Sequence, residues 1–511
     1  MKYRKFLPLA VSLVVLLALG IIFVRVSLRN NDGHWVYGLD DAYIHMAMAK
    51  NFTTHGVWGV TRYAYTAASS SPLWTSLLAA GYAVTGPREM ASLYWNFLFA
   101  LLVVVAAWAF LVAQGASGRL QLLLLLGIVT VAGVQLASFG MEHLLHILLM
   151  LLFLALVIPD LAADGPTPRS RLYWLALVTP LVVLARFESL GFIAVTIVLY
   201  ACRKRWLPAL LLVVMSILPV VVTGLISLAH GAFFLPNSIL IKTALRGDPA
   251  SRYEFLPFIV GHAMGFLLYS PLLAVMLASA LFFFVAQRVR REPFWVGRSL
   301  LLLLFIFVTV GHIVSAQVGP LYRYEVYLII LGILALGLNL AVELRRQAAP
   351  KETDPVEIAP IQESSVPPDK PEEEIAYYRL AVLTLTCVLG ILLTIRIIQT
   401  YTGALRATSN IYQQQYQMAR FLREYYPHAP VIANDIGAIS YFTDIHLLDL
   451  YGLGTLDMAK MVLAHKPFPA IFTDYLPIRQ SRIAVIYDSW YSPSLHPSWV
   501  LVGQWKLEHN V

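Results

Sequence analysis

The sequence predicts an α-helical, multi-span membrane protein with about eleven transmembrane helices, outer juxtamembrane helices and a small C-terminal α/β domain outside the membrane. Of its 511 residues, 59% are hydrophobic and only 13% are charged, a balance typical of integral membrane proteins. Apolar windows of roughly 17 to 25 residues, the length that crosses a bilayer core, recur along the chain. After residue 400 they give way to short apolar runs separated by turn residues.

The remaining composition argues against other classes of function. The net charge of +8 comes largely from short basic clusters between apolar segments, which favours a role in membrane orientation, so we expect no nucleic-acid partner. Cys202 lies at the end of one apolar run and Cys387 inside another, without the spacing of a disulfide framework or metal site. The sequence indicates no required cofactor. Its carboxylates are compatible with a divalent metal, but no ligand spacing points to one.

The N-terminal segment predicts an uncleaved first span. A basic start precedes an apolar core of about twenty residues, and no small-x-small cleavage site follows. Further apolar segments of similar length continue to the C-terminal region. The expected spans are residues 6–28, 91–114, 119–137, 141–159, 172–187, 188–202, 206–229, 263–286, 298–318, 325–342 and 378–398.

The basic clusters predict the orientation of these spans. If the basic N-terminus lies in the cytoplasm, every later basic cluster falls on the same side, which places the C-terminal segment outside the cell membrane. This assignment requires that residues 69–87 do not cross the bilayer. That run is short and contains Gly81 and several polar side chains, so we expect a helix lying in or dipping into the outer leaflet. The clusters are Arg119, 168–171, 203–205, 288–291 and 345–346.

Composition also predicts the domain boundaries. Residues 1–345 form a membrane module, whose outer segment 29–90 carries the juxtamembrane helices. Residues 346–375 are rich in Pro, Glu and Lys and predict a disordered cytoplasmic linker before a last span at 376–400. Residues 401–511 begin with a helical pattern and continue with strand-length runs, "VIA" and "HLLDL", which predict a small α/β domain.

Polar residues at the membrane edge gather in the loops predicted to lie outside. A charge in the bilayer is unfavourable by about 2.5 to 3.5 kcal/mol, so several on one side indicate a shared function. Capping of helix ends at the interface is the competing explanation for any one of them. As a set, carboxylates and cations can complement each other around one cavity. The set comprises Asp40, Asp41, Glu142, Arg186, Glu188, Asn237, Lys242, Arg323, Glu325 and Asp435.

Asp40 and Asp41 are candidate catalytic residues. Adjacent residues on a helix point in different directions, so we expect one, Asp41, to cap the helix that ends at His55-Gly56. The other then projects into the cavity, where a carboxylate can act as a general base toward a hydroxyl group. A doubled N-terminal cap remains the alternative. His45, one turn after Asp41, can face the same cavity, although a lone His is more often structural.

Three cations are candidates for binding a phosphate. Arg offers a planar fork of donors and Lys a point charge, and either suits a lipid phosphate at the outer membrane edge. Snorkelling to ordinary headgroups is the competing explanation. These candidates are Lys242, Arg323 and Arg186.

Taken in order, these motifs resemble the GT-C superfamily of integral-membrane glycosyltransferases, which use polyprenyl-phosphate-linked sugars. The double-Asp form is similar to the mycobacterial cell-wall arabinofuranosyltransferases, and more distantly to the protein O-mannosyltransferases and the lipid A aminoarabinose transferase. The resemblance covers most of the chain. Its motifs are "DDAYIHMAMAKNFTTHGVWG", "SSSPLWTSLLAAGYAVTG", "GMEH", "ARFES", "LPNSILIKT", "RYEVYL", "NDIGAISYF" and "LLDLYGLG".

The resemblance implies a GT-C fold, a catalytic Asp in the first outer loop and a lipid phosphate held by cations. Glu142 matches the acidic position of a Gly-Met-Glu motif and Glu188 that of an Arg-x-Glu motif, and both become candidate substrate contacts with His45, Asn237 and Asp435. The sequence departs from the family in two places. Phe187 stands where the family has Pro, and Glu325 where an apolar residue is common.

The expected function is sugar transfer from a polyprenyl-phosphate donor to a hydroxyl of a cell-envelope glycan, lipid or protein at the outer face. No Gly-rich loop suited to a soluble nucleotide sugar is present. A transporter or flippase of lipid-linked sugars is the first alternative, although such sites favour the bilayer midplane. A non-catalytic assembly protein whose tail recruits other enzymes is the second.

Overall fold

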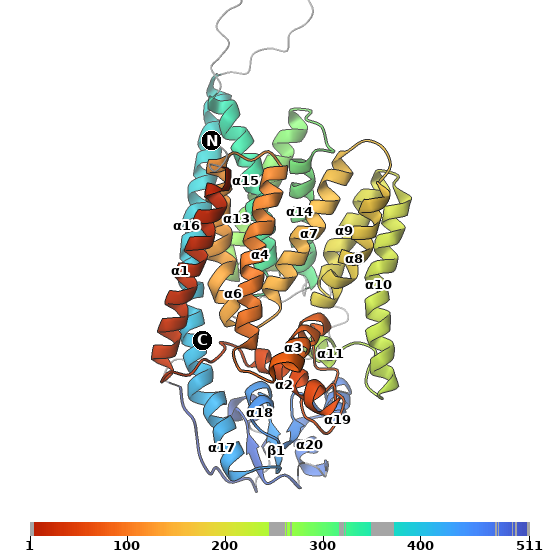
Figure 1. Ribbon diagram of the computed structural model, residues 1–511, viewed down its shortest axis with the longest axis vertical. Coiled ribbons are helices and arrows are strands. Elements are labelled where there is room, and N and C mark those ends of the chain that lie inside the picture. The colour runs from red at the N-terminus through yellow and green to blue at the C-terminus, as the bar shows by residue number, and fades with distance from the viewer. Residues whose placement is uncertain are drawn as a thin grey trace, which may run out of the picture.

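A computed structural model of the chain describes residues 5–244, 268–315, 323–348, 372–475, 480–492 and 498–507, together with 261, 263–265, 321, 478, 494 and 495. Long helices form a bundle, and a small C-terminal domain lies at one end of it, here called the domain end (Figure 1). Two short helices, α2 (Asp40–His55) and α3 (Pro72–Thr85), lie between the bundle and that domain (Figure 1).

Within the described residues, nine helical segments are long and apolar enough to cross a membrane. They contain α1 (Leu7–Asn30), α4 (Ala91–Ala113), α5 (Gly118–Ile128) with η2 (Val129–Gly133) and α6 (Val134–Ser138), α7 (His143–Ala162), α10 (Trp206–Ala229), α13 (Pro271–Val289), α14 (Gly297–Ser315), α15 (Val326–Ala348) and α16 (Glu372–Ile411).

Two shorter helices complete the bundle. α8 (Arg169–Ala185) packs against α7 and α10, and α9 (Ser189–Cys202) packs against α10 and α14. With the nine candidate spans they match the segments expected from hydropathy, and the predicted multi-span helical fold is confirmed. The chain is a multi-pass membrane protein.

Some expected boundaries differ from the structure. The span expected at 263–286 corresponds to α13, which begins only at Pro271 because the proline at the first helical position starts a new helix. The last span is 40 residues long and continues through η5 (Tyr412–Tyr416) into α17 (Gln417–Tyr425). One helical rod therefore connects the membrane bundle to the C-terminal domain. Residues 349–371 of the expected linker lie outside the described residues. The prediction that this linker is disordered therefore stays a prediction.

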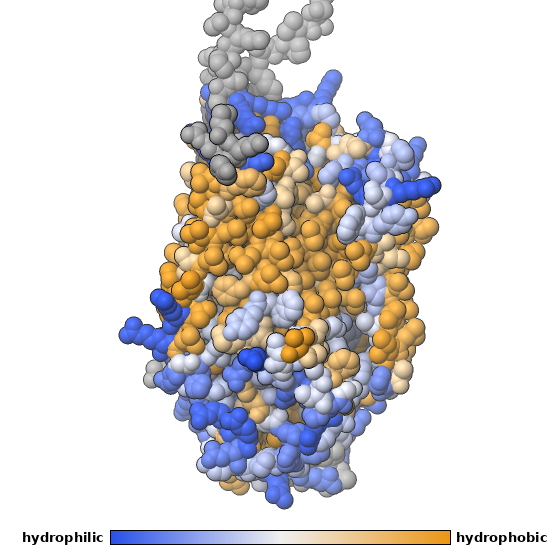
Figure 2. All heavy atoms as spheres, viewed as in Figure 1, coloured by the Kyte–Doolittle hydropathy of each residue, from blue (hydrophilic) through white to orange (hydrophobic). Residues whose placement is uncertain are grey.

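The surface is divided into an apolar belt and two polar ends (Figure 2). The alternating helices bring the basic clusters together at the end opposite the C-terminal domain. There Arg171 and Arg205 both pair with buried Asp160, at 3.3 and 3.5 Å. The belt lies between the two ends, as expected for a protein surrounded by lipid.

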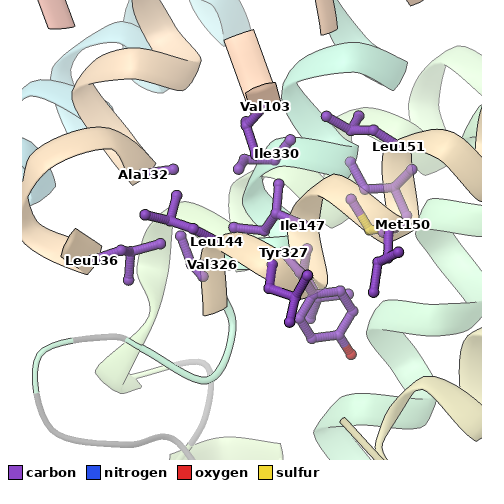
Figure 3. Packing of buried hydrophobic residues seen from close by; sticks show 14 of the residues in the cluster. Val103, Ala132, Leu136, Leu144, Ile147, Met150, Leu151, Val326, Tyr327 and Ile330 are labelled. Atoms are coloured by element: carbon purple, nitrogen blue, oxygen red, sulfur yellow. The ribbon is translucent and has the colours of Figure 1, made fainter. Parts of the chain in front are cut away.

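The core of the bundle is aliphatic. Helices α4, α7 and α15 interlock with the η2–α6 segment around side chains that are almost fully buried (Figure 3). Close packing of this kind holds membrane helices together, since lipid supplies little hydrophobic force between them. Figure 3 labels Val103, Ala132, Leu136, Leu144, Ile147, Met150, Leu151, Val326, Tyr327 and Ile330.

Helices α2 and α3 can be compared with the predictions made for the outer segment, residues 29–90. α2 begins at Asp40, with Leu39 at the N-cap position, so the expected capping of this helix by Asp41 is wrong. Its expected end is confirmed, because Gly56 has a φ of 70°, the left-handed conformation that favours glycine. α3 has only 14 residues, fewer than a membrane span requires.

The C-terminal domain contains a three-stranded parallel sheet in the order β2-β1-β3. Pro430 pairs with His446, and Val431 with Ile483. Because the strands are parallel, their carboxyl ends lie at one edge of the sheet. The elements of the domain are β1 (Pro430–Ala433), α18 (Gly437–Phe442), β2 (His446–Asp449), α19 (Leu456–Leu463), α20 (Phe468–Asp474), β3 (Ile483–Val485) and α22 (Asp488–Tyr491).

Candidate functional site

Asp40 connects α2 to the C-terminal domain. Its Oδ2 atom accepts the backbone N–H of Gly437 at 2.6 Å, and its Oδ1 atom accepts that of Ala438 at 2.8 Å. These N–H groups begin α18, where unpaired helical donors favour a carboxylate. Burial and then the Asp435 carboxylate raise the pKa of Asp40, against the two N–H groups, which lower it.

Asp41 faces the other way, toward the membrane bundle. Its Oδ2 atom lies 2.9 Å from Nη2 of Arg323, which precedes α15. The Asp41 side chain is 32% exposed, whereas that of Arg323 is 8% exposed. Nε and Nη1 of Arg323 are buried and have no hydrogen-bond partner within the described part of the chain. The sequence predicted that Asp41 caps α2 and that Asp40 projects into the cavity, whereas the structure places Asp41 against Arg323 and Asp40 against the start of α18.

A second buried cation lies in the turn between α8 and α9. Arg186 donates from Nη1 to Glu142 at 2.6 Å and from Nη2 to Glu188 at 2.7 Å. Glu142 is fully buried, but the Glu188 side chain is 45% exposed. Nη1 of Arg186 also lies 3.0 Å from Nδ1 of His143. The structure therefore brings Arg186, Glu142 and Glu188 together as one ion-pair group.

His45 and Tyr324 link the two cations. Nε2 of His45 lies 3.9 Å from Oε2 of Glu142, and Nδ1 lies 2.8 Å from the hydroxyl oxygen of Thr75. The ring of Tyr324 lies beside both guanidinium groups, at 5.5 Å from Arg186 and 4.8 Å from Arg323. Asp41 and His45, one helical turn apart on α2, thus face one cluster of two arginines and their carboxylate partners.

Asp435 lies on the opposite side of Asp40, just after β1. Its carboxylate accepts the Tyr487 hydroxyl at 2.7 Å and Nε2 of Gln415 at 2.8 Å. Burial raises the pKa of Asp435, against the hydrogen bonds from Gln415 and Tyr487, which lower it. Asp435 therefore lies close enough to Asp40 to act on it electrostatically.

Asn237 and Lys242 lie on α11 (Asn237–Ala244). The Asn237 amide nitrogen is 3.3 Å from the Gly452 carbonyl oxygen and 3.2 Å from that of Leu453. These bonds attach α11 to the C-terminal domain and are separate from the arginine cluster. The side chain of Lys242 lies outside the described residues.

An apolar cavity of about 650 Å³ lies beside the arginine cluster. Ser69, whose hydroxyl is 3.4 Å from Nδ1 of His45, is part of its wall, and so is Leu184, two residues before Arg186. The cavity is bounded by the end of α2, the start of α3 and the last turns of α8 and α10. Its larger lining side chains include Phe52, Trp58, Tyr63, Tyr65, Leu73, Ile226 and Phe234.

The sequence did not single out Lys50, which helps to organise this region. Lys50 donates to the carbonyl oxygens of Ser440 and Tyr441 at the end of α18, at 3.3 and 2.5 Å. It lies on the same helix as Asp40, yet no local pattern identifies its partner. Glu325, noted as a departure from the family, lies 3.6 Å from Arg396 of α16 and offsets that buried charge.

Comparisons with known proteins agree with this architecture. A family model described as a domain of unknown function, DUF8728, matches residues 409–511. No curated protein matches the sequence. The structure of ArnT from Cupriavidus metallidurans bound to undecaprenyl phosphate is similar, with a TM-score of 0.52, 17% identity and coverage of 94% of this chain and 90% of that chain.

Two further solved structures are similar to the chain. The apo state of the same ArnT has a TM-score of 0.50 and 16% identity, and the match covers 94% of this chain and 93% of that one. An Archaeoglobus fulgidus oligosaccharyltransferase in complex with Zn and sulfate has a TM-score of 0.45 and 12% identity, with coverage of 84% and 62%. The likeness to ArnT confirms the predicted fold, a multi-span helical bundle with a small C-terminal domain.

Proposed function

We propose that the protein is a membrane glycosyltransferase that moves a sugar from a polyprenyl-phosphate donor to a hydroxyl group of a cell-envelope acceptor. The observation that carries this proposal is the contact of Asp41 with Arg323 at 2.9 Å, one helical turn from His45, which lies 3.4 Å from Ser69 in the wall of an apolar cavity. It places a partly exposed carboxylate next to a buried cation, which are the two charges that the reaction requires. The similarity to a GT-C fold supports the same assignment.

Arg323 is the proposed phosphate contact. Only Nη2 of its guanidinium bonds to Asp41, and Nε and Nη1 are buried without a partner in the described residues. A buried donor without a partner is unfavourable by about 1 to 3 kcal/mol, and phosphate oxygens satisfy guanidinium donors well. Arg186 adds a second positive charge nearby. We keep Lys242 as a proposed third contact.

Asp41 is the proposed general base. Asp40 already accepts two backbone N–H groups, whereas Asp41 is partly exposed beside Arg323. In the reaction, the acceptor oxygen bonds to the anomeric carbon as its proton passes to Asp41. The bond between that carbon and the phosphate oxygen breaks, and its electron pair leaves with the phosphate beside Arg323. This scheme needs no cofactor.

The apolar cavity is the proposed site for the first isoprene units of the donor. Ser69 in its wall lies 3.4 Å from His45, and Leu184 in its wall is two residues before Arg186. The ArnT structure with undecaprenyl phosphate supports a lipid of this class in a chain of the same fold. We propose that the domain end faces outward from the cell membrane and that the N-terminus is cytoplasmic, because the basic clusters gather at the opposite end.

The test is transfer of radiolabelled sugar from a panel of polyprenyl-phosphate pentoses and hexoses by the purified full-length protein in lipid nanodiscs. Asp41→Asn is expected to lower kcat by about 10² to 10⁴, the usual contribution of a general base, and to change the donor Kd little. Asp40→Asn is the matched comparison, because it alters the adjacent carboxylate without touching the proposed base.

The same preparation distinguishes a transporter. Wild-type protein that consumes no donor, but moves labelled lipid across vesicles with or without Asp41, would overturn the enzyme proposal. Full transfer activity in Asp41→Asn would retain the enzyme and reject Asp41 as its base.

A further inference from the structure

The carboxyl edge of the C-terminal sheet carries polar and aromatic side chains that the proposed transfer does not use. β1 ends at Ala433 and is followed by Asn434 and Asp435, and β3 ends at Val485 shortly before Tyr487 and Trp490. β2 pairs with β1 on one side of that strand, and β3 pairs with it on the other side, so the connections from β1 to β2 and from β2 to β3 run in opposite directions across the sheet. In open parallel sheets, such a change of direction opens a crevice beyond the carboxyl ends, where ligands bind.

A hydrogen-bonded cluster lies in this position. Tyr487 donates its backbone N–H to Oδ1 of Asn434 at 2.9 Å and its hydroxyl to Asp435 at 2.7 Å. Nε2 of Gln415, from η5, lies 2.6 Å from the Tyr487 hydroxyl oxygen. These bonds fix planar polar side chains from three segments in one place.

Two atoms of this cluster are left without a partner. Oε1 of Gln415 and Nδ2 of Asn434 are buried and make no hydrogen bond to any described residue, and their residues are 5% and 6% exposed. One is an acceptor and the other a donor. A hydroxyl group both donates and accepts, so a ligand bearing several hydroxyls can satisfy both.

Aromatic rings border the same edge. Trp490 is 54% exposed, and its ring centroid lies 5.2 Å from that of Tyr487 and 6.2 Å from that of Tyr451. An exposed aromatic face packs well against the C–H face of a sugar ring, while polar neighbours bind the hydroxyls. The combination suits a carbohydrate better than a lipid chain.

The charges of the edge determine which carbohydrate fits. Asp435 and Asp40 act on each other electrostatically, and Asp488 is exposed at the start of α22. The cations of the site, Arg323 and Arg186, are engaged with Asp41 and with Glu142 and Glu188. The exposed Asp488 carboxylate repels a phosphorylated acceptor, so the edge favours an uncharged one.

We propose that this edge is the acceptor site and that it binds a neutral, hydroxyl-rich glycan, whose reacting hydroxyl then reaches Asp41 past Asp40. This inference rests on the proposed transferase function and adds the class of acceptor to it. The edge site consists of Asn434, Asp435, Gln415, Tyr487 and Trp490.

The test measures binding of glycans without requiring transfer. The probes are neutral arabinan, mannan and galactan hexasaccharides, the same glycans carrying one phosphate, and a Ser/Thr-rich peptide. Titration of the full-length protein in nanodiscs is followed by saturation-transfer difference NMR. The variants are Trp490→Ala and Gln415→Met, with Tyr425→Ala as control, because Tyr425 is exposed in the same domain near the amino ends of the strands.

We expect at least one neutral hexasaccharide to bind, with Kd raised 10-fold or more in Trp490→Ala and Gln415→Met and unchanged in Tyr425→Ala. Preference for the phosphorylated glycans or the peptide, or neutral binding that both variants leave intact, would overturn the inference.

Release of polyprenyl phosphate from the labelled donor is measured on the same samples. Donor turnover without neutral glycan binding would reject the acceptor site and retain the transferase. Glycan binding without any donor turnover would instead reject the transferase.

Discussion

Asp40 and Gly437 lie 397 residues apart in the sequence, yet the carboxylate of one accepts the backbone N–H of the other at 2.6 Å. A Cβ atom on Gly437 would lie only 1.9 Å from the backbone oxygen of Asp40. At the far end of α18, Lys50 binds two carbonyl oxygens. α2 therefore holds α18 at both ends, with a carboxylate at the positive end and an ammonium at the negative end of its dipole.

Replacement of Gly437 by alanine is expected to displace α18 from α2. The backbone of Asp40 cannot retreat without moving Asp41, so we expect transfer activity to fall 10-fold or more and amide exchange in residues 430–442 to accelerate. Hydrogen exchange with mass spectrometry checks the second effect. Gly503→Ala is the control, because Gly503 is exposed and a Cβ there would contact nothing within 4 Å. If amide exchange in residues 430–442 were equally slow in Gly437→Ala and Gly503→Ala, the proposal that α2 holds α18 in place would be contradicted.

The pH dependence of stability is expected to reflect Asp449. Its buried carboxylate accepts the N–H groups of Tyr451 at 2.8 Å and Gly454 at 2.7 Å. Burial raises the pKa of Asp449 from 3.8 to about 6, so the folded chain binds this proton more tightly than the unfolded chain does. Its stabilising contribution is complete below about pH 4 and disappears as the pH rises through about 6, a change of about 3 kcal/mol.

Thermal unfolding of wild type and Asp449→Asn between pH 4 and 7 measures this contribution. The amide does not titrate, so we expect the wild-type advantage in melting temperature to shrink as the pH rises from 4 to 7. Parallel curves for the two proteins across this range would contradict the assignment.

The sequence predicted the helical bundle because hydropathy depends only on local composition. It could not predict the length of α16, since apolar character declines near residue 398 whereas the helix continues to Ile411. A helix end depends on caps and tertiary contacts as well as on hydropathy. The long rod is stabilised at its outer part by contacts such as Thr408 with Ser27, at 3.2 Å.

The sequence also located the Asp pair and the Arg186 group, but not the division of roles. Asp40 and Asp41 differ because Gly437 and Arg323, distant in sequence, lie on opposite sides of them. Nothing local distinguishes two adjacent carboxylates in this way. The sequence did not identify Gln415 for the same reason, because its partner Tyr487 lies in another element that is distant in sequence.

The two carboxylates bound by Arg186 are expected to contribute unequally to stability. Glu142 is fully buried, so Glu142→Gln leaves part of a buried guanidinium charge uncompensated and should lower the unfolding free energy by about 3 kcal/mol. Glu188 is partly exposed, and Glu188→Gln should lower it by about 1 kcal/mol or less. Unfolding in mixed SDS micelles measures both. Equal losses of unfolding free energy in the two variants would show that burial does not determine how much each ion pair contributes to stability.

Arg323 is expected to control the use of the donor more than the stability of the fold. Its Nε and Nη1 atoms have no partner among the described residues, so Arg323→Gln should remove phosphate contacts that form only with donor present. We expect kcat/KM for the donor to fall by about 10² to 10³, as when a preorganised donor to developing charge is removed. Arg323→Lys restores the charge without the planar fork and should recover part of this loss.

Arg62→Gln is the control, because Arg62 is an exposed cation of the outer segment that pairs with Asp444 at 2.9 Å. If Arg323→Gln and Arg62→Gln had the same kcat/KM, the leaving phosphate would have to be stabilised by Arg186 or Lys242 instead.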